Sequence, residues 1–265
     1  MVLVGFVFLK YYLVFPSYDG FNVMVDVRHY FYHMSFLTST WSYLPFANYK
    51  VLPALLKPYL PKGTQLDLRG DLADISLVGL RFENTRILNL PVPFHINFSE
   101  INLRFYVRQT GTNRRGVVFI KEIVDKPLIT LVANKLYNER YDTMPLGFQL
   151  EANKELHHVH YKWKPKDWQE MGVTYEPAAL SIEDGSNEQF ILERYFGYSS
   201  YDPQTTYEYE VRHASWKHYK VTDHQINVNF EQTYGKEFAV LDTLEPNSVM
   251  MAHGSRISIE NKRKL

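Results

Sequence analysis

The sequence predicts a mainly β protein of the α+β class, built from strands and hairpins with a few short helices. Three observations support this fold class. Residues that favour strands are abundant, with 20 Tyr and 17 Phe among 265 residues. Short apolar–polar alternations recur along the chain, separated by turns that contain Gly, Pro or Asn. Segments with helical spacing are few and short, and several are bounded by proline.

The composition allows a full hydrophobic core and argues against several classes of function. Hydrophobic residues make up 45% of the chain and charged residues 22%. Lys+Arg and Asp+Glu both number 29, so no basic surplus is present to neutralise the phosphates of a nucleic acid. The absence of cysteine excludes a disulfide framework, a thiolate nucleophile and a cysteine-based metal site. We expect a cytoplasmic protein without cofactor or metal. The sequence leaves open whether the protein forms a homo-oligomer.

The chain divides into an N-terminal extension over residues 1–33, a single domain over 34–258 and a charged tail over 259–265. The extension is apolar, but Lys10 interrupts it, and it lacks the basic start and cleavage site of a signal peptide. Its apolar run is too short for a stable membrane span. It could be an extra strand, a weak membrane anchor, or sequence that lies upstream of the true start or is disordered. We favour the last interpretation because strong patterning begins only near Met34.

The first half of the domain is predicted to consist of strands with one short helix. The segments, in order, are a strand within 36–49, a helix within 52–63, strands over 64–68 and 73–82, a loop or lid over 87–98, and strands over 100–109 and 115–124. Three prolines limit the helix, and two prolines argue against a ladder strand in the loop. The residues "TGTN" at 110–113 predict a hairpin between the last two strands.

The second half begins at Pro127, where helical spacing extends to about residue 141. Further segments follow in order: strands over 157–164, 193–201, 205–216 and 225–230, a short helix over 186–195, a late helix over 231–244 and a closing strand over 255–261. Ser186 and Gln189 give the short helix a capping-box pattern. The last four residues are expected to form a solvated tail.

Common catalytic and metal-binding motifs are not found. His158 and His160 share one face of a predicted strand, but no third ligand follows at a metal-binding spacing, so we expect no metal site. The chain has no GxSxG nucleophile turn. The sequence "GTNRRG" is typical of a hairpin turn, because a phosphate-binding loop would join a strand to a helix.

A polar face on the central hairpin is the most informative constellation. Glu100, Asn102 and Arg104 alternate with apolar residues and therefore share one face of a strand. Glu122 lies on the partner strand. Alternation alone leaves two alternatives open, because the face could be exposed to solvent or could line the lumen of a closed barrel. In the second case it would form a pocket with few polar groups and many aromatic walls.

Several blocks of the sequence, in order, resemble one family. The blocks are "FLTSTWSYLPFANYKVLPALLKPYLPKGTQLDL", "ISLVGLRFENTRILNLPVPFHINFSEINLRFYVR", "RRGVVFIKEIVDKPLITLVANKLYNERY" and "FILERYFGYS". From about residue 34 to 258 the chain resembles the YqjF-like family of uncharacterised bacterial proteins in the acetoacetate decarboxylase-like superfamily. This resemblance implies a closed or nearly closed antiparallel β-cone with peripheral helices and a central cavity.

The resemblance also bears on Schiff-base chemistry. Acetoacetate decarboxylase uses a lysine whose pKa is lowered by a neighbouring cation. Its motif places a Glu five residues before a Pro that two adjacent lysines follow. Glu122 and Pro127 match this motif, but Leu128 and Ile129 replace the lysine pair. Lys126 precedes the proline and has no adjacent amine, so Schiff-base decarboxylation is not expected.

We therefore expect a central cavity that binds a small organic ligand such as a carboxylate. Arg104 would bind the carboxylate through its planar guanidinium, with Asn102 beside it. Glu122, like Glu100, would act as a base or as an ion-pair partner. His95 and Tyr198 would close the mouth of the cavity.

Two alternatives remain open at the level of the sequence. The protein could be a non-catalytic structural or sensor protein whose lumen charges form a buried network. It could instead be an enzyme of the decarboxylase or lyase type that uses carboxylate acid–base chemistry. Glu122, Glu100 and Lys126 are the candidate catalytic residues in that case.

Overall fold

The computed structural model describes residues 12–16, 22–26 and 35–265. Strand β1 (Tyr12–Pro16) pairs antiparallel with β2 (Asn22–Asp26) in a sheet of their own. The rest of the N-terminal extension, and with it our interpretation of residues 1–33, lies outside the described residues. Among the described residues, no helix combines the length and the apolar character that a membrane crossing requires.

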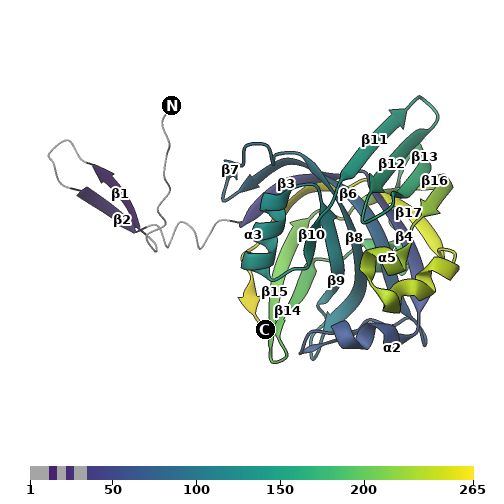
Figure 1. Ribbon diagram of the computed structural model, residues 1–265, viewed down its shortest axis with the longest axis horizontal. Coiled ribbons are helices and arrows are strands. Elements are labelled where there is room, and N and C mark those ends of the chain that lie inside the picture. Colours follow the sequence, from purple (N-terminus) through teal and green to yellow (C-terminus); the bar gives the residue numbers. More distant parts are fainter. Residues whose placement is uncertain (1–11, 17–21, 27–34) are drawn as a thin grey trace.

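A closed β-barrel forms the centre of the domain and confirms the predicted fold class (Figure 1). Its strands, in order around the barrel, are β3 (Leu37–Ser42), β6 (Ala73–Ile87), β8 (Phe98–Gln109), β9 (Arg115–Val124), β14 (Phe196–Asp202), β15 (Thr205–His213) and β18 (Ser255–Ile259), which returns to β3. The barrel is antiparallel except at one seam. There β9 and β14 pair in parallel, through Gly116↔Phe196 and Val117↔Gly197. The short strand β10 (Tyr141–Thr143) also pairs in parallel with β9.

A second sheet packs against the outside of the barrel and shares strand β6 with it. Its further strands are β4 (Leu44–Val51), β17 (Ser248–Ala252), β16 (Lys217–Asn227), β13 (Gln169–Ser181), β12 (His157–Trp163) and β11 (Leu146–Ala152). Strand β6 serves both sheets because it is 15 residues long, pairing with β4 through residues 73–78 and with β3 through residues 81–87. Short strands β5 (Thr64–Leu66) and β7 (Leu90–Pro91) border β8 and β6.

Two hydrophobic cores lie on opposite faces of the central strands. On β8, Ile101, Leu103 and Phe105 belong to the core between the two sheets. The alternate side chains of β8 face the barrel lumen, where Phe98 and Tyr106 belong to the second core. Every side chain of β8 from residue 98 to 107 is consequently buried, and the polar face of this strand is an interior face.

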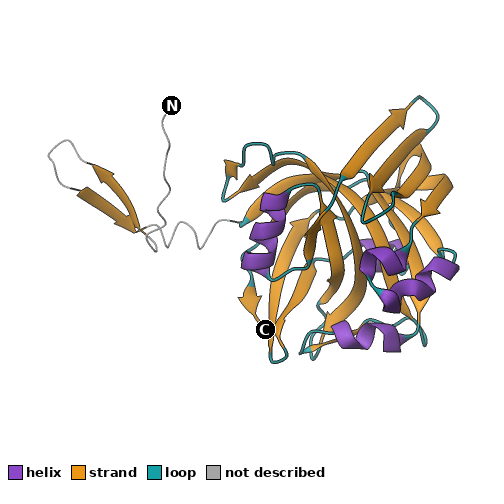
Figure 2. Ribbon diagram, in the orientation of Figure 1, coloured by secondary structure: helices purple, strands orange, loops and turns teal. Residues whose placement is uncertain are grey.

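The helices are short and lie outside the strands (Figure 2). They are α2 (Pro53–Leu56), η1 (Lys57–Tyr59), α3 (Pro127–Tyr137), α4 (Asn187–Leu192), α5 (Phe230–Tyr234) and η2 (Lys236–Thr243). Ser186 caps α4 as predicted, because its hydroxyl accepts a hydrogen bond from the Gln189 N–H at 3.0 Å. The late helix expected over 231–244 is interrupted at Gly235, whose φ of 119° is incompatible with helix.

Other segments differ from the sequence-based expectations. Strands β11, β13 and β17 are present although no strand was expected there. The C-terminal residues do not form a free solvated tail, since β19 (Arg263–Lys264) pairs with β15 and Arg263 forms an ion pair with the buried Glu208. The loop expected over 87–98 is confirmed over 88–97 apart from the two residues of β7, since Ile87 ends β6 and Phe98 begins β8.

Candidate functional site

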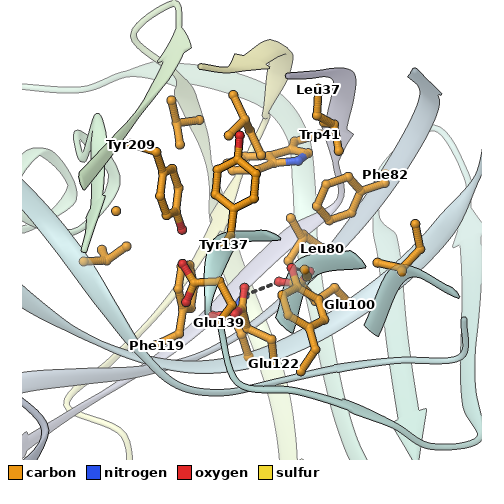
Figure 3. Close-up of a pocket in the computed structure, with 18 of the residues that line it drawn as sticks. Leu37, Trp41, Leu80, Phe82, Glu100, Phe119, Glu122, Tyr137, Glu139 and Tyr209 are labelled. Carbon is orange, nitrogen blue, oxygen red and sulfur yellow. Dashed lines mark hydrogen bonds between the residues drawn. The ribbon is translucent and has the colours of Figure 1, made fainter. Parts of the chain in front are cut away.

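The barrel lumen contains a cavity of about 110 Å³. This is several times the roughly 10–15 Å³ that one water needs on the same measure, so a small organic molecule could enter. Most of the wall is apolar, and the residues used below are Trp41, Leu80, Phe82, Phe119, Tyr137 and Tyr209. Helix α3 covers one side through Ile129, Val132 and Ala133. The carboxyl groups of Glu100, Glu122 and Glu139 are grouped at one end, below Tyr137 in Figure 3.

Four of the side chains singled out in the sequence meet in this cavity. Glu100, Asn102 and Arg104 extend inward from β8, and Glu122 extends from β9. Their exposed fractions are 3%, 2%, 8% and 3%. Glu122 is the register partner of Asn102 across the β8–β9 pair. Of the two alternatives left open by the alternation, the structure therefore has the polar face in the lumen rather than in solvent.

Glu139, Tyr141 and Tyr209 also line the cavity, and sequence reasoning missed them. The sequence pattern after Pro127 predicts a helix to about residue 141, but α3 ends at Tyr137. Asn138 follows in the left-handed conformation, with φ 56°, and the chain then turns back toward the barrel. An Asn that tolerates this conformation is a helix C-terminal signal, and it could have indicated that Glu139 and Tyr141 leave the helix.

The carboxyl groups at this end have an incomplete set of hydrogen bonds. Glu100 is satisfied, since Asn102 Nδ2 donates to its Oε1 at 2.9 Å and the Tyr141 hydroxyl donates to its Oε2 at 2.8 Å. By contrast, Glu122 Oε2, Glu139 Oε1 and Asn102 Oδ1 are buried without a protein partner. Buried polar atoms are normally paired, so these three oxygens require explanation.

Burial changes the protonation of all three carboxyls. It raises the pKa of Glu100 to about 7 and that of Glu139 to about 8. The pKa of Glu122 is also raised well above its usual range, first by burial and then by repulsion from Glu139 and Glu100. Near neutral pH the group therefore holds protons, and its members can donate as well as accept hydrogen bonds.

Arg104 differs from the second arginine of the lining, Arg194. The Arg194 guanidinium forms an ion pair with Asp67 at 2.7 Å. The Arg104 guanidinium lies over the ring of Phe46 at 4.9 Å, and its Nε has no hydrogen-bond partner. In the part of the chain that the structure describes, no carboxylate oxygen lies within 4.0 Å of Arg104. A buried cation without a close counter-charge is costly.

His95 and Tyr198 do not close the mouth of the cavity, contrary to expectation. His95 lies in the loop after β7, with its Nδ1 2.8 Å from the carbonyl oxygen of Pro93. Tyr198 is buried, but its hydroxyl donates to Glu208 Oε2 at 2.9 Å. Neither residue belongs to the cavity lining. The aromatic residues that do line this space, such as Tyr137 and Tyr209, come from α3 and β15.

Lysine is absent from the described residues that line the cavity. Lys126 precedes the first residue of α3, and its ammonium group lies 3.3 Å from Asp125 Oδ2. Of the two residues that replace the lysine pair, Leu128 is 44% exposed and Ile129 lines the cavity. The start of α3 therefore presents an aliphatic side chain to the lumen.

The histidines of β12 have partners within the outer sheet. His158 Nδ1 lies 2.9 Å from the Thr174 hydroxyl, and His160 Nε2 lies 3.1 Å from Glu170 Oε2. Their rings stack with centroids 6.2 Å apart, so they share a face as the strand pattern indicates. Among the described residues, no group of three or more His, Cys, Asp or Glu side chains is placed to hold a metal ion.

The barrel and its internal cavity define the class of protein, which has an acetoacetate decarboxylase-like fold. The enduracididine biosynthesis enzyme MppR complexed with pyruvate is similar with a TM-score of 0.62 and 11% identity, covering 86% of this chain and 90% of that one. Acetoacetate decarboxylase from Legionella pneumophila gives a TM-score of 0.61 at 10% identity, covering 99% and 92%. An acetoacetate decarboxylase-like enzyme from Sphingomonas wittichii gives 0.59 at 14% identity, covering 86% and 92%. These likenesses concern the fold alone.

The sequence shows to which family the chain belongs. Residues 38–256 match the model of DUF2071, described as an uncharacterized conserved protein, and the chain therefore belongs to this family. The match confirms the resemblance to YqjF-like proteins. Among functionally curated proteins, none matches the sequence.

Proposed function

We propose that the lumen binds a small organic molecule whose acidic group, such as a carboxylate, contacts Arg104. The observation that carries this proposal is the unpaired state of Arg104, which is 8% exposed and has no carboxylate within 4.0 Å among the described residues. A bound anion would supply the missing counter-charge. The guanidinium is suited to this role because its planar N–H groups can bind a carboxylate in a bidentate manner.

The rest of the cavity limits the size and character of the ligand. Most of its wall is aromatic or aliphatic, and its polar groups are few. Small-molecule sites commonly combine an apolar wall with a few oriented polar groups. The proposal is supported by MppR, a protein of similar fold whose structure is complexed with pyruvate, a small carboxylate. We expect a ligand with an apolar body and few polar groups.

Schiff-base chemistry is not part of this proposal. Such chemistry needs an amine at the reacting centre with a lowered pKa. No lysine lines the cavity among the described residues, and Lys126 is paired with Asp125. If a reaction takes place, acid–base chemistry by the carboxyls is the second candidate, because the pKa of Glu100, raised by burial to about 7, is suited to proton transfer near neutral pH.

A purely structural role for the lumen charges is less well supported. A network that only fixes the barrel would be expected to satisfy its own polar atoms. Here Glu122, Glu139, Asn102 and Arg104 each have a buried atom without a protein partner. Such atoms are better explained by groups that meet a ligand.

The proposal is tested by calorimetric titration of the protein and of Arg104→Met with 3-phenylpropanoate and with pyruvate. We expect at least one probe to bind, and the substitution to weaken its binding about tenfold or more, since a bidentate contact is lost. Arg108→Met is the matched control, because Arg108 lies on the same strand but is exposed. Equal affinities of the protein and of Arg104→Met for the probe would contradict the proposal.

A further inference from the structure

We propose that the end of the lumen formed by Glu122 and Glu139 binds a cationic nitrogen of the ligand, of the amine, amidine or imidazole class. The ligand would then carry a basic nitrogen as well as an acidic group. The inference that the ligand has an acidic group rests on the proposed function at Arg104. The inference that it has a basic nitrogen rests on separate residues. The chemical class of ligand is a small amphipathic molecule with two opposite charges.

The polar atoms of the lining that have no hydrogen-bond partner fall into two groups, N–H donors and oxygen acceptors. The buried N–H groups without a partner belong to Arg104, Arg194 and Trp41. The buried oxygens without a partner belong to Asn102, Glu122 and Glu139. Both arginines lie over the ring of Tyr106, at 5.9 Å and 4.9 Å, and therefore occupy one region of the cavity.

The oxygen atoms occupy a different region, to which three segments contribute. Glu122 comes from β9, Glu139 from the connection between α3 and β10, and Asn102 from β8. Figure 3 shows Glu139, Glu122 and Glu100 grouped together below Tyr137. Glu122 is 3% exposed and Asn102 is 2% exposed, so solvent does not satisfy these side chains. A donor that enters the lumen could pair with them.

Like charges make this region selective for a cation. Glu139 and Glu100 both raise the pKa of Glu122 by repulsion, after burial. A cationic N–H group between Glu122 and Glu139 would donate to their free oxygens and remove that repulsion at the same time. An anion at this position would not relieve the repulsion between the carboxylates. The neighbouring rings of Tyr137, Tyr209 and Phe119 add faces that attract cations.

The two charged ends are close enough for one small ligand. Glu122 is opposite Asn102 in the β8–β9 register, and Asn102 is two residues from Arg104 along β8. Two residues of a strand span roughly 7 Å. A molecule with a few bonds between its acidic group and its nitrogen could therefore reach both.

Binding of a cation would be coupled to proton release. The titratable and charged groups around this end are Glu100 and Arg104 on β8, Glu122 on β9, Glu139, Arg140 and Tyr141 after α3, Tyr209 on β15, and Lys262. The carboxyls hold protons near neutral pH, and a cation favours their ionised forms. Affinity for a cation should therefore rise with pH, by up to about tenfold per unit for each proton released.

The test measures the binding of benzylamine and of its neutral isostere benzyl alcohol to the protein. Binding is measured by NMR titration at about pH 6 and about pH 8. We expect benzylamine to bind more tightly than the alcohol at the higher pH, and about tenfold more tightly there than at the lower pH. The double variant Glu122→Gln/Glu139→Gln should lose this preference and its pH dependence. Glu151→Gln, an exposed change on β11, is the matched control.

Two outcomes would overturn the proposal: equal affinities for amine and alcohol at about pH 8, or unchanged amine binding in the double variant. The comparison of amine with alcohol in the unsubstituted protein decides the question even if the double variant does not fold. The proposed function fails on a different measurement, namely unchanged binding of 3-phenylpropanoate by Arg104→Met. The two failures are therefore distinguishable.

Discussion

At the scale of single residues, the lumen is defined by charges that the protein itself leaves partly unpaired. Glu100 receives two hydrogen bonds, from Asn102 and Tyr141, whereas Glu122 and Glu139 each retain a buried oxygen without a partner. Carboxyls in such surroundings hold their protons to higher pH than they do in water. Protonation of these groups therefore links the stability of the fold to pH.

The sign of this linkage follows from the direction of the shifts. Burial raises the pKa of Glu139 to about 8 in the folded protein, whereas a Glu in the unfolded chain titrates near about 4.3. Between these values the unfolded state has released a proton that the folded state still holds, so stability falls as pH rises through this range. At pH values below this range, Glu139 makes its full contribution to the stability of the fold.

We predict that Glu122→Gln/Glu139→Gln removes much of this loss. Its melting temperature should be close to that of the unsubstituted protein at about pH 5 and higher at about pH 8, with about 2–4 °C for each kcal/mol of stability regained. Thermal denaturation at both pH values measures the difference, with Glu151→Gln as the control. If the melting temperatures of the double variant and of the unsubstituted protein differ by the same amount at both pH values, these carboxyls do not titrate between the two values.

At the scale of elements, local signals place the helix termini, and these termini position the site. Pro127 begins α3, and Asn138 ends it in the left-handed conformation. That turn directs the next segment toward β9, where Tyr141 pairs in register with Glu122. In α4 the first turn is fixed by Ser186, and the buried face of the helix includes Phe190, whose ring lies 5.7 Å from that of Tyr106.

Loss of the cap of α4 should therefore be measurable. Ser186→Ala removes the acceptor for the Gln189 N–H, and we predict a loss of about 0.5–2 kcal/mol of unfolding free energy. Ser186→Gly should lower the unfolding free energy by only a few tenths of about 1 kcal/mol, because glycine is tolerated at this position. Urea denaturation compares the two variants. An equal loss in both would indicate that the hydroxyl does not act as a cap.

At the scale of the whole molecule, the barrel closes through a short parallel seam. Only Gly116↔Phe196 and Val117↔Gly197 pair β9 with β14. The approach is close, since a Cβ on Gly116 would lie 2.4 Å from the carbonyl oxygen of Phe196. A Cβ on Gly197 would lie 2.2 Å from the ring of Tyr209, which lines the cavity. Both glycines are therefore required by proximity rather than by backbone angle.

A methyl group at this seam should destabilise the barrel. For Gly116→Ala we predict a loss of roughly 1–3 kcal/mol, because backbone atoms cannot move aside cheaply. Gly147→Ala is the matched control on β11, where the added Cβ would meet only the flexible side chain of Lys162 at 3.1 Å. This change should be neutral or slightly stabilising, since glycine weakens strands. Chemical denaturation of both variants tests the pair, and equal losses would contradict the role of the seam.

Sequence patterns predicted the elements whose signals are local. The hairpin of β8 and β9, the start of α3 at Pro127 and the cap of α4 follow from turn, proline and capping residues. Strand β13 was missed because it lacks a simple alternation: it is buried over residues 171–173 and exposed over 178–181. The split of the late helix at Gly235 was missed because a single glycine inside a helical pattern does not by itself end a helix.

By itself, the sequence determined that Glu100, Asn102 and Arg104 share one face of a strand, because side chains alternate along any strand. Tertiary structure alone decided that this face is the lumen, because only the second sheet buries the opposite face of β8. Tertiary structure also added Glu139 to the site, and it placed Tyr198 and Lys126 outside it. A cavity is formed by segments far apart in the chain, and their approach depends on packing that no local pattern records.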